Sequence, residues 1–171
     1  FYNNKMNISV KIEIIQEDKK SVFVDIPNDI FDKIELINTS IERTNEKKVV
    51  LPFPDITLLD HTNTETYMKQ IIHFLQQNEV KEKEMKIDKK YELFFEISKG
   101  ISKTKQQMDL LSYIFLCDNI HPAIKLRDLT ELSNYYGISV LFDDFLIPLQ
   151  KNIIYNHNLV FTQICNFFKC K

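Results

Sequence analysis

Residues 47–56 read KKVVLPFPDI, a short apolar run that is followed by two prolines. The Val-Val-Leu run is typical of a short strand. Proline has no N–H to offer a neighbouring strand, and it favours extended geometry in the residue before it. Pro52 and Pro54 therefore predict that this strand lies at the edge of a sheet and ends abruptly.

Two segments with alternating apolar residues precede this strand. Residues 8–15 and 21–26 both show the two-residue period of a half-buried strand. The apolar positions are Val10, Ile12, Ile14, Val22, Val24 and Ile26. Because the QEDKK between the segments is polar and turn-like, the two segments predict a β-hairpin.

Helical spacing of apolar residues begins after the hairpin. One helix is expected over residues 29–44, capped by Asn28 or Asp29, and another over residues 64–78. Their buried faces are predicted to hold Ile30, Ile34, Ile37 and Ile41 in the first helix and Met68, Ile71, Ile72 and Leu75 in the second. The mixed charges of residues 79–90 are expected to form a solvated loop.

Further helices are expected in the second half of the chain. Residues 91–97 indicate a single helical turn, and residues 105–120 form the most apolar helix, which places it in the middle of the domain. Another helix is expected over residues 123–136, with Pro122 before it and Gly137 as its C-cap.

The C-terminal tail is rich in apolar residues. Two weaker helices are expected at about 140–155 and 158–168, with Pro148 kinking or splitting the first. The tail either folds back and completes the core or offers a hydrophobic groove to a partner helix, and both can hold at once. The predicted partner contacts, which share one helical face, are Phe142, Phe145 and Leu149.

The composition is that of a globular chain. Of the 171 residues, 44% are hydrophobic and 27% are charged, and the formal net charge is −2. That charge gives no electrostatic reason to expect a nucleic-acid partner. No apolar run approaches the roughly 20 residues that span a bilayer, and the first residues show no secretory signal. We therefore expect no membrane partner and a cytoplasmic and/or nuclear location.

Residues with catalytic or metal-binding chemistry are scattered. The histidines, which show no metal-site spacing, are His61, His73, His121 and His157. We expect His73 to be a buried or half-buried structural residue, and Cys117 to be a thiol packed within the apolar helix. Cys165 and Cys170 are too loosely spaced for a zinc knuckle. The sequence therefore predicts no enzyme activity, no catalytic residue, no cofactor and no metal ion.

The segments described above resemble, in order and in sequence, the BTB/POZ fold. More narrowly, they resemble the S-phase kinase-associated (Skp) and elongin C family of small adaptors in cullin-type ubiquitin ligases. Residues 10–30 are similar to the family's opening hairpin and the start of its first helix. KKVVLPFPDI is similar to its third strand, which ends in a Leu-Pro motif, and YMKQIIHFLQQN at 67–78 to the helix that follows.

The resemblance continues with YELFFEI at 91–97 and with the paired helices MDLLSYIFLCDNIHPAIKLRDLTELSNYY at 108–136. It implies an α+β, BTB/POZ-like fold in which a small three-stranded sheet packs on a helical bundle. The core domain would comprise residues 1–136, and residues 137–171 would form a C-terminal helical extension.

The resemblance also implies a non-enzymatic function in protein–protein interaction. A Skp-like adaptor joins a cullin-type scaffold to an F-box-like substrate receptor. The scaffold would contact the turn that holds Asn119 and Ile120, and the receptor would contact the tail at Phe142, Phe145 and Leu149.

Two other functions are compatible with the same fold. BTB domains commonly associate with copies of themselves, so the chain could be a self-associating scaffold without a role in a ligase. The segment LCDNIHPAIKL and the tail differ from the family pattern, which favours a third interpretation. In that interpretation the chain is a diverged structural subunit, for example from a virus or a parasite.

Overall fold

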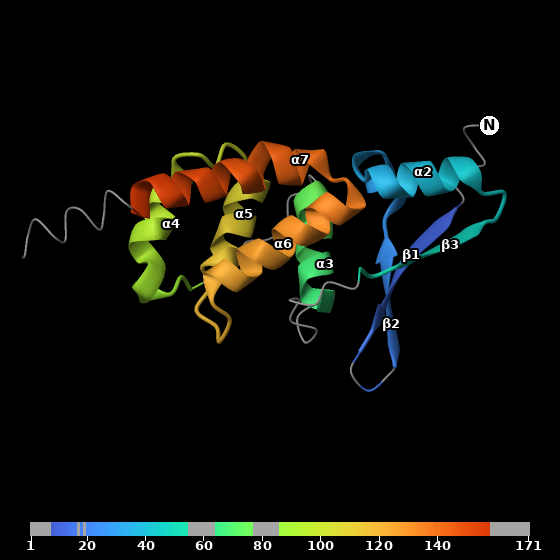
Figure 1. Ribbon diagram of the computed structural model, residues 1–171, viewed down its shortest axis with the longest axis horizontal. Helices are drawn as coiled ribbons and strands as arrows, with labels where there is room; N and C mark the ends of the chain where they lie inside the picture. Colours follow the sequence, from blue (N-terminus) through green and yellow to red (C-terminus); the bar gives the residue numbers. More distant parts are fainter. Residues whose placement is uncertain (1–7, 17, 19, 55–63, 77–85, 158–171) are drawn as a thin grey trace, which may run out of the picture.

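The computed structural model describes residues 8–16, 18, 20–54, 64–76 and 86–157. In this part of the chain a small sheet lies at one end and helices make up the remainder (Figure 1), which confirms the expected α+β class. The elements are β1 (Ser9–Ile15), β2 (Ser21–Ile26), η1 (Asn28–Lys33), α2 (Glu35–Arg43), β3 (Lys48–Pro52), α3 (Thr64–Leu75), η2 (Lys89–Tyr91), α4 (Glu92–Lys99), α5 (Lys105–Ile114), α6 (Pro122–Tyr136), α7 (Ser139–Leu141) and η3 (Phe142–Leu146). Residues 147–157 continue the helix after η3.

The sheet has the strand order β2-β1-β3. β1 and β2 form the predicted antiparallel hairpin, in which Ile12 lies opposite Val24. β3 runs parallel to β1 and lies at an edge, as its prolines predict. Pairing ends just after Pro52, where the N–H of Phe53 donates to the Glu13 carbonyl at 3.1 Å.

The helix expected over residues 29–44 is divided into two elements. η1 follows Pro27 as its N-cap, and Ile34 is extended before α2 begins, so neither Asn28 nor Asp29 is the cap residue. The division has a tertiary cause, because the N–H of Glu35 donates to the Gly137 carbonyl at 3.2 Å. The predicted stripe is nevertheless buried: Ile30, Ile34, Ile37 and Ile41.

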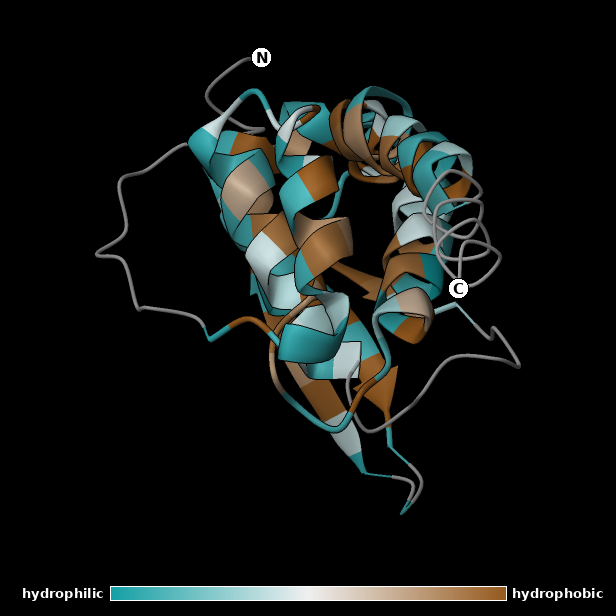
Figure 2. Ribbon diagram, turned by 90° about the vertical axis from the view of Figure 1, so that its left-hand side faces the viewer, coloured by the Kyte–Doolittle hydropathy of each residue, from teal (hydrophilic) through white to brown (hydrophobic). Residues whose placement is uncertain are grey.

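α3 supplies a broader buried face than its spacing predicts. Met68, Ile71 and Leu75 are buried as expected, whereas Ile72 is only half-buried. Tyr67 and Phe74 are buried as well, and the Phe74 ring stacks on that of Phe145 with centroids 6.1 Å apart. Figure 2 shows apolar and polar residues alternating along the helices, as packing on one face requires.

α5 ends at Ile114, six residues earlier than the predicted helix over 105–120. The chain then turns to meet residues 86–88: Ile87 forms an antiparallel bridge with Leu116, and the N–H of Cys117 donates to the Lys86 carbonyl at 2.8 Å. Cys117 is consequently an exposed free thiol, which corrects the prediction of a thiol packed in a helix. Ile87 packs against the core, whereas Lys86, Lys89 and Lys90 are exposed as expected of a solvated segment, and residues 79–85 lie outside the described part.

α4 and α6 both lie close to the positions that the sequence predicts. α4 spans eight residues rather than a single turn. Pro122 is the first residue of α6, and Gly137 follows its end with a left-handed φ of 69° and ψ of 48°, the expected C-cap.

The tail packs on the core in the described residues. The turns of η3 are π-helical, just before Pro148, whose missing N–H disturbs a regular helix. The helix continues through residues 147–157 rather than being split, and the second predicted helix at 158–168, with Cys165 and Cys170, lies outside the described residues, as does His61.

Two of the three predicted receptor-side residues have core positions. Phe145 and Leu149 are 1% and 0% exposed, and Phe142 is half-buried. Phe145 lies against Phe74 of α3, so the apolar face of the tail is used to complete the core. The tail thus completes the core, one of the two alternatives predicted for it, and Phe145 and Leu149 are not exposed to a partner. Within the described ranges, no helix has both the length and the apolar composition to cross a membrane.

Candidate protein-interaction surfaces

The turn between α5 and α6 is organised by one carboxylate. Asp118 Oδ1 accepts from the N–H of Ile120 at 2.9 Å, and its Oδ2 accepts from Nζ of Lys125 at 2.6 Å. Asn119, which follows Asp118 in the sequence, is exposed, and Ile120 is half-buried. The predicted scaffold-side residues therefore lie on a turn with a defined backbone conformation.

Lys125 is the fully buried partner in this arrangement, with 0% of its side chain exposed. Its Nζ donates to the carbonyl oxygen of Tyr113 at 2.9 Å and lies 4.8 Å from the centroid of the Tyr113 ring. A carbonyl in the last turn of α5 lacks an intrahelical partner, and the negative end of a helix dipole attracts a cation. Lys125, near the start of α6, is therefore hydrogen-bonded both to the end of α5 and to the turn.

His121 caps α6 on the other side of the turn. Its Nδ1 accepts from the N–H of Ala123 at 3.0 Å, so Nδ1 carries no proton in this arrangement. The ring also packs edge-on against Tyr91, with centroids 5.3 Å apart. The exposed turn thus has side-chain caps at both of the helices that it joins.

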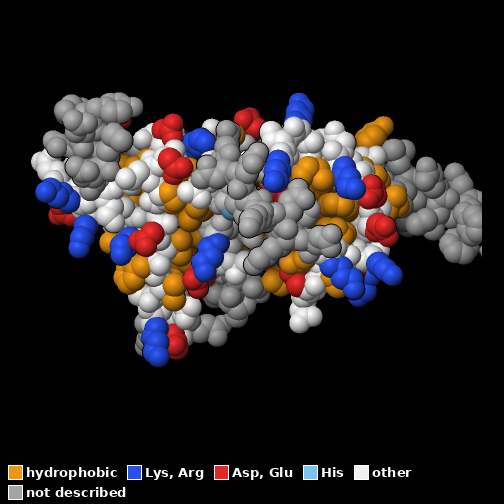
Figure 3. Space-filling model, turned by 180° about the vertical axis from the view of Figure 1, so that it is seen from behind, with side chains coloured by type: hydrophobic (Ala, Val, Ile, Leu, Met, Phe, Trp, Pro, Cys, Tyr) orange, Lys and Arg blue, Asp and Glu red, His pale blue; other side chains and the backbone are white. Residues whose placement is uncertain are grey.

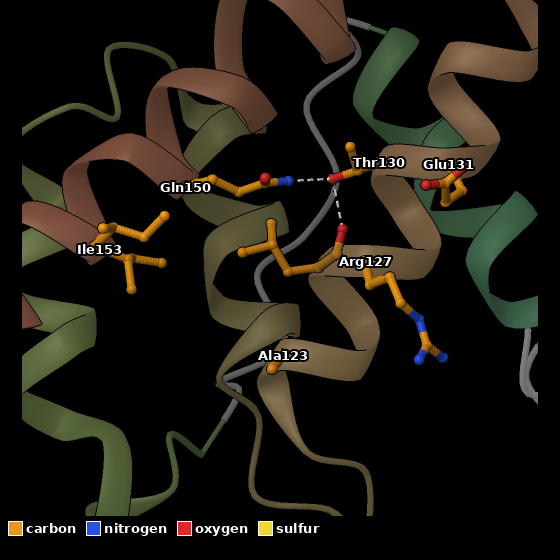
Figure 4. Close-up of a pocket in the computed structure, with 8 residues that line it drawn as sticks. Ala123, Arg127, Thr130, Glu131, Gln150 and Ile153 are labelled. Carbon is orange, nitrogen blue, oxygen red and sulfur yellow. Dashed lines mark hydrogen bonds between the residues drawn. The ribbon is translucent and has the colours of Figure 1, made fainter. Parts of the chain in front are cut away.

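A groove between α6 and residues 147–157 forms a second surface. It has a volume of about 310 Å³, and its lining residues are Ala123, Leu126, Arg127, Thr130, Glu131, Gln150, Ile153 and Ile154. Gln150 Nε2 donates to Thr130 Oγ1 at 2.7 Å and joins the two helices across the groove (Figure 4). Arg127 and Glu131 point away from the facing helix, as Figure 4 shows, so the floor between the helices is mainly apolar.

Exposure near this groove is concentrated on the last described turns of the tail. Ile154 is 64% exposed and Tyr155 is 68% exposed. Phe94 of α4 packs on His157 with ring centroids 5.9 Å apart, which brings α4 to the same end of the molecule. An exposed apolar side chain beside a groove between two helices is what a partner helix with an apolar face would cover.

Other polar residues lie inside the bundle. Burial, and secondarily the charges of Asp118 and Asp128, raise the pKa of Tyr113 well above its ordinary value. The Tyr113 hydroxyl and Asp128 Oδ2 have no hydrogen-bond partner among the described residues. His73 is half-buried and lies 3.2 Å from Asp109 through its Nε2, as expected of a structural histidine. In the described ranges no group of three or more His, Cys, Asp and Glu could hold a metal ion.

Sequence reasoning did not single out Lys125 beside the turn or Ile153 and Ile154 in the groove, although the sequence held a signal for Lys125. Lys125 occupies the same helical face as Leu129 and Leu132, which was visible in the spacing of α6. A lysine on an apolar stripe needs a carboxylate partner, and Asp118 is the nearest preceding acid. Ile153 and Ile154 lie in the tail at positions whose exposure depends on where α6 lies, which no local pattern specifies.

Comparisons with protein-family models, with curated proteins and with solved structures found no match to this chain.

Proposed function

We propose that this chain is a non-enzymatic adaptor that joins two other proteins, and that its fold is BTB/POZ-like of the Skp and elongin C kind. In this proposal a cullin-like scaffold binds the turn at Asn119 and Ile120. A receptor helix, F-box-like in its role, binds the groove between α6 and residues 147–157. The groove takes the place of the predicted receptor-side residues, because Phe145 and Leu149 belong to the core and Phe142 is half-buried.

The order of elements supports the fold in this proposal. A hairpin, a helical segment, a third edge strand and then a series of helices follow one another in the order on which the sequence resemblance rests. The third strand ends at Pro52, where the resemblance places the family's Leu-Pro motif.

The observation that carries the proposed function is the open groove. Its apolar floor and the 64% exposure of Ile154 leave apolar area that a partner helix can bury. The turn at Asn119 lies before the first residue of α6, whereas the groove extends along that helix to Glu131. Two partners at these surfaces would contact different residues of the chain, as an adaptor requires.

Affinity purification of the tagged chain from cells of its source tests both surfaces. Asn119→Ala/Ile120→Ala is expected to remove a cullin-type scaffold and keep a receptor. Ile154→Lys is expected to remove the receptor and keep the scaffold, because a charge replaces an apolar contact in the groove.

The matched control for the groove is Tyr155→Lys. Tyr155 is as exposed as Ile154 but does not line the groove. The adaptor proposal fails if no cullin-type protein is recovered, or if the turn variant recovers it as well as the unaltered chain does. The groove is excluded as the receptor site if Tyr155→Lys and Ile154→Lys lose the receptor equally.

A further inference from the structure

The free edge of β2 is a feature that the adaptor function does not use. β2 pairs with β1 on one side, and no strand in the described part of the chain pairs with its other side. Phe23, in the middle of this strand, is 51% exposed. The edge lies over the sheet end of the molecule, where Figure 3 shows apolar side chains gathered at the lower left.

The hydrogen-bond pattern indicates which backbone groups this edge presents. The N–H of Gln16 donates to the Lys20 carbonyl at 2.9 Å, so this opposed pair is hydrogen-bonded. Bonded and non-bonded pairs alternate along an antiparallel ladder. The β2 residues whose backbone groups face β1 are therefore Val22, Val24 and Ile26. Those whose N–H and C=O groups face outward are Ser21, Phe23 and Asp25.

The other side of β1 agrees with this alternation. The N–H of Ser9 donates to the Lys47 carbonyl, and the Glu13 carbonyl accepts from Phe53, both on the β3 side. The alternate β1 residues, such as Ile12, are consequently left to face β2.

The two edges of the sheet differ in how they resist pairing. β3 is short and ends at Pro52, which removes a donor from its edge. β2 contains neither proline nor lysine, the residues that commonly protect an edge. Its only charge is Asp25, which lies 3.5 Å from Lys11 on the neighbouring strand.

We propose that a second copy of this chain docks on the β2 edge, strand against strand, with Phe23 of each copy opposite Phe23 of the other. In this antiparallel register every outward N–H of one copy meets an outward C=O of the other. The result is a continuous sheet through both copies, related by a two-fold axis.

The side chains are self-complementary in this register. Asp25 lies opposite Ser21 of the second copy, so the carboxylates do not face each other. Val22 lies opposite Val24 on the inner side of the sheet, and the two exposed Phe23 rings cover one another at the centre. Aromatic and β-branched cross-strand pairs are among those that stabilise antiparallel strands. Moving the register by two residues would place Ser21 opposite Phe23, so the two Phe23 rings would no longer face each other.

The dimer is compatible with the proposed adaptor surfaces. Figure 1 shows the sheet at one end of the molecule and α4, with the last turns of the tail, at the other. Pairing through β2 leaves the groove and the α5–α6 turn of both copies open. Formation of the dimer does not depend on what those surfaces bind.

Sedimentation equilibrium of the purified full chain over a range of concentrations tests the dimer. The unaltered chain is expected to show a reversible monomer–dimer equilibrium. Phe23→Lys is expected to raise the dissociation constant roughly tenfold or more, because the two-fold axis places like charges directly opposite each other. Mixing Phe23→Lys with Phe23→Glu is expected to restore dimers through opposite charges.

Val50→Lys is the matched control, because Val50 has the same 51% exposure and lies on the other edge strand. It is expected to leave the dissociation constant unchanged, and circular dichroism verifies that each variant keeps its fold. The proposal is overturned if the unaltered chain remains monomeric at every concentration, if Val50→Lys dissociates the dimer as strongly as Phe23→Lys, or if the oppositely charged variants fail to combine.

Discussion

The two ends of α6 are closed in different ways. At the first turn, side chains make the stabilising hydrogen bonds. His121 accepts from the N–H of Ala123, and Lys125 donates to the Asp118 carboxylate and to the Tyr113 carbonyl at the end of α5. The atoms involved lie directly beneath an exposed turn. This end is therefore fixed in conformation while its outer residues remain free to contact a partner.

At its last turn, α6 is closed by packing and by the backbone. Gly137 turns the chain with a left-handed φ, and its carbonyl accepts from the N–H of Glu35 in α2. The hydroxyl of Tyr136 donates to the Pro52 carbonyl of β3 at 3.1 Å. This end joins α6 to β3 and α2, so its contacts contribute to the stability of the fold.

A buried ion pair and a tight backbone approach therefore have different consequences when they are broken. Substitutions at the first end should lower stability and also alter the exposed turn and the partner that it binds. Substitutions at the last end should lower the stability of the whole domain without a separate effect on partner binding.

The largest expected effect is that of Asp118→Ala. It leaves the charge of Lys125 buried without its carboxylate, and breaking a buried pair in this way costs about 3 kcal/mol of unfolding free energy. Urea denaturation measures the loss. Lys125→Met keeps the buried volume and leaves Asp118, whose side chain is 28% exposed, in contact with water, so its loss should be smaller. Equal losses in the two variants would show that the unpaired charge is not the cause.

The next largest effect is expected from Gly137→Ala, at the opposite end of α6. A Cβ there would lie 2.7 Å from Cβ of Glu35, on a backbone with φ of +69° that L-residues rarely adopt. We expect a loss of about 2 kcal/mol, measured as a lower urea midpoint. Gly100→Ala is the control, because its Cβ would meet only the Ile97 carbonyl at 3.5 Å. A loss as large at Gly100 would contradict the steric explanation.

Alkaline pH should weaken both ends of the helix through two buried phenols. Burial raises the pKa of Tyr113 and of Tyr136, with smaller contributions from Asp118 and Asp128 at the first and from Tyr135 at the second. As the pH rises, the unfolded chain releases these protons at about pH 10, which is lower than the pH at which the folded chain releases them. Stability should therefore be unaffected by these groups below that pH and fall above it, by at most about 1.4 kcal/mol per pH unit for each phenol.

Urea midpoints measured across this pH range check the phenol prediction. Tyr113→Phe and Tyr136→Phe should each make the alkaline decline less steep. Tyr136→Phe should also lower stability at neutral pH, because it loses the hydrogen bond to Pro52. A decline of unchanged slope in the double variant would mean that other groups cause it.

The smallest effect is expected from His121→Ala, which removes the side-chain cap of α6. The loss of a cap of this kind costs about 1 kcal/mol. Hydrogen exchange of the Ala123 amide should accelerate, whereas that of amides near Gly137 should not. His121→Asn supplies another capping acceptor and should restore most of the protection. Uniform acceleration along α6 would contradict a local capping role.

Much of the fold could be predicted from local patterns. The alternation at Val10, Ile12 and Ile14 predicted β1, and the prolines after Leu51 predicted an edge strand, because both depend on the chemistry of neighbouring residues. Gly137 was predicted as a C-cap for the same reason, since the left-handed conformation itself selects glycine.

The candidate site could be predicted only in part. The turn at Asn119 and Ile120 was found through the resemblance and lies exposed or half-buried as expected. The predicted receptor-side residues Phe145 and Leu149 are buried, because a helical face made of large apolar residues is equally suited to the core and to a partner. A groove beside the tail was predicted, but its position between α6 and residues 147–157 was not, because that position depends on the spacing between two helices.

The sequence by itself determined the strands, the identity of most helices and the residues that face inward, because short-range periodicity and turn chemistry control these features. Tertiary structure decided where helices begin and end. The Gly137 carbonyl accepts from the N–H of Glu35, where α2 begins after Ile34, and pairing with residues 86–88 ends α5 at Ile114. It also decided that Lys125 is buried, since a lysine enters a core only where folding brings a carboxylate and a further acceptor, here the Tyr113 carbonyl, to meet it.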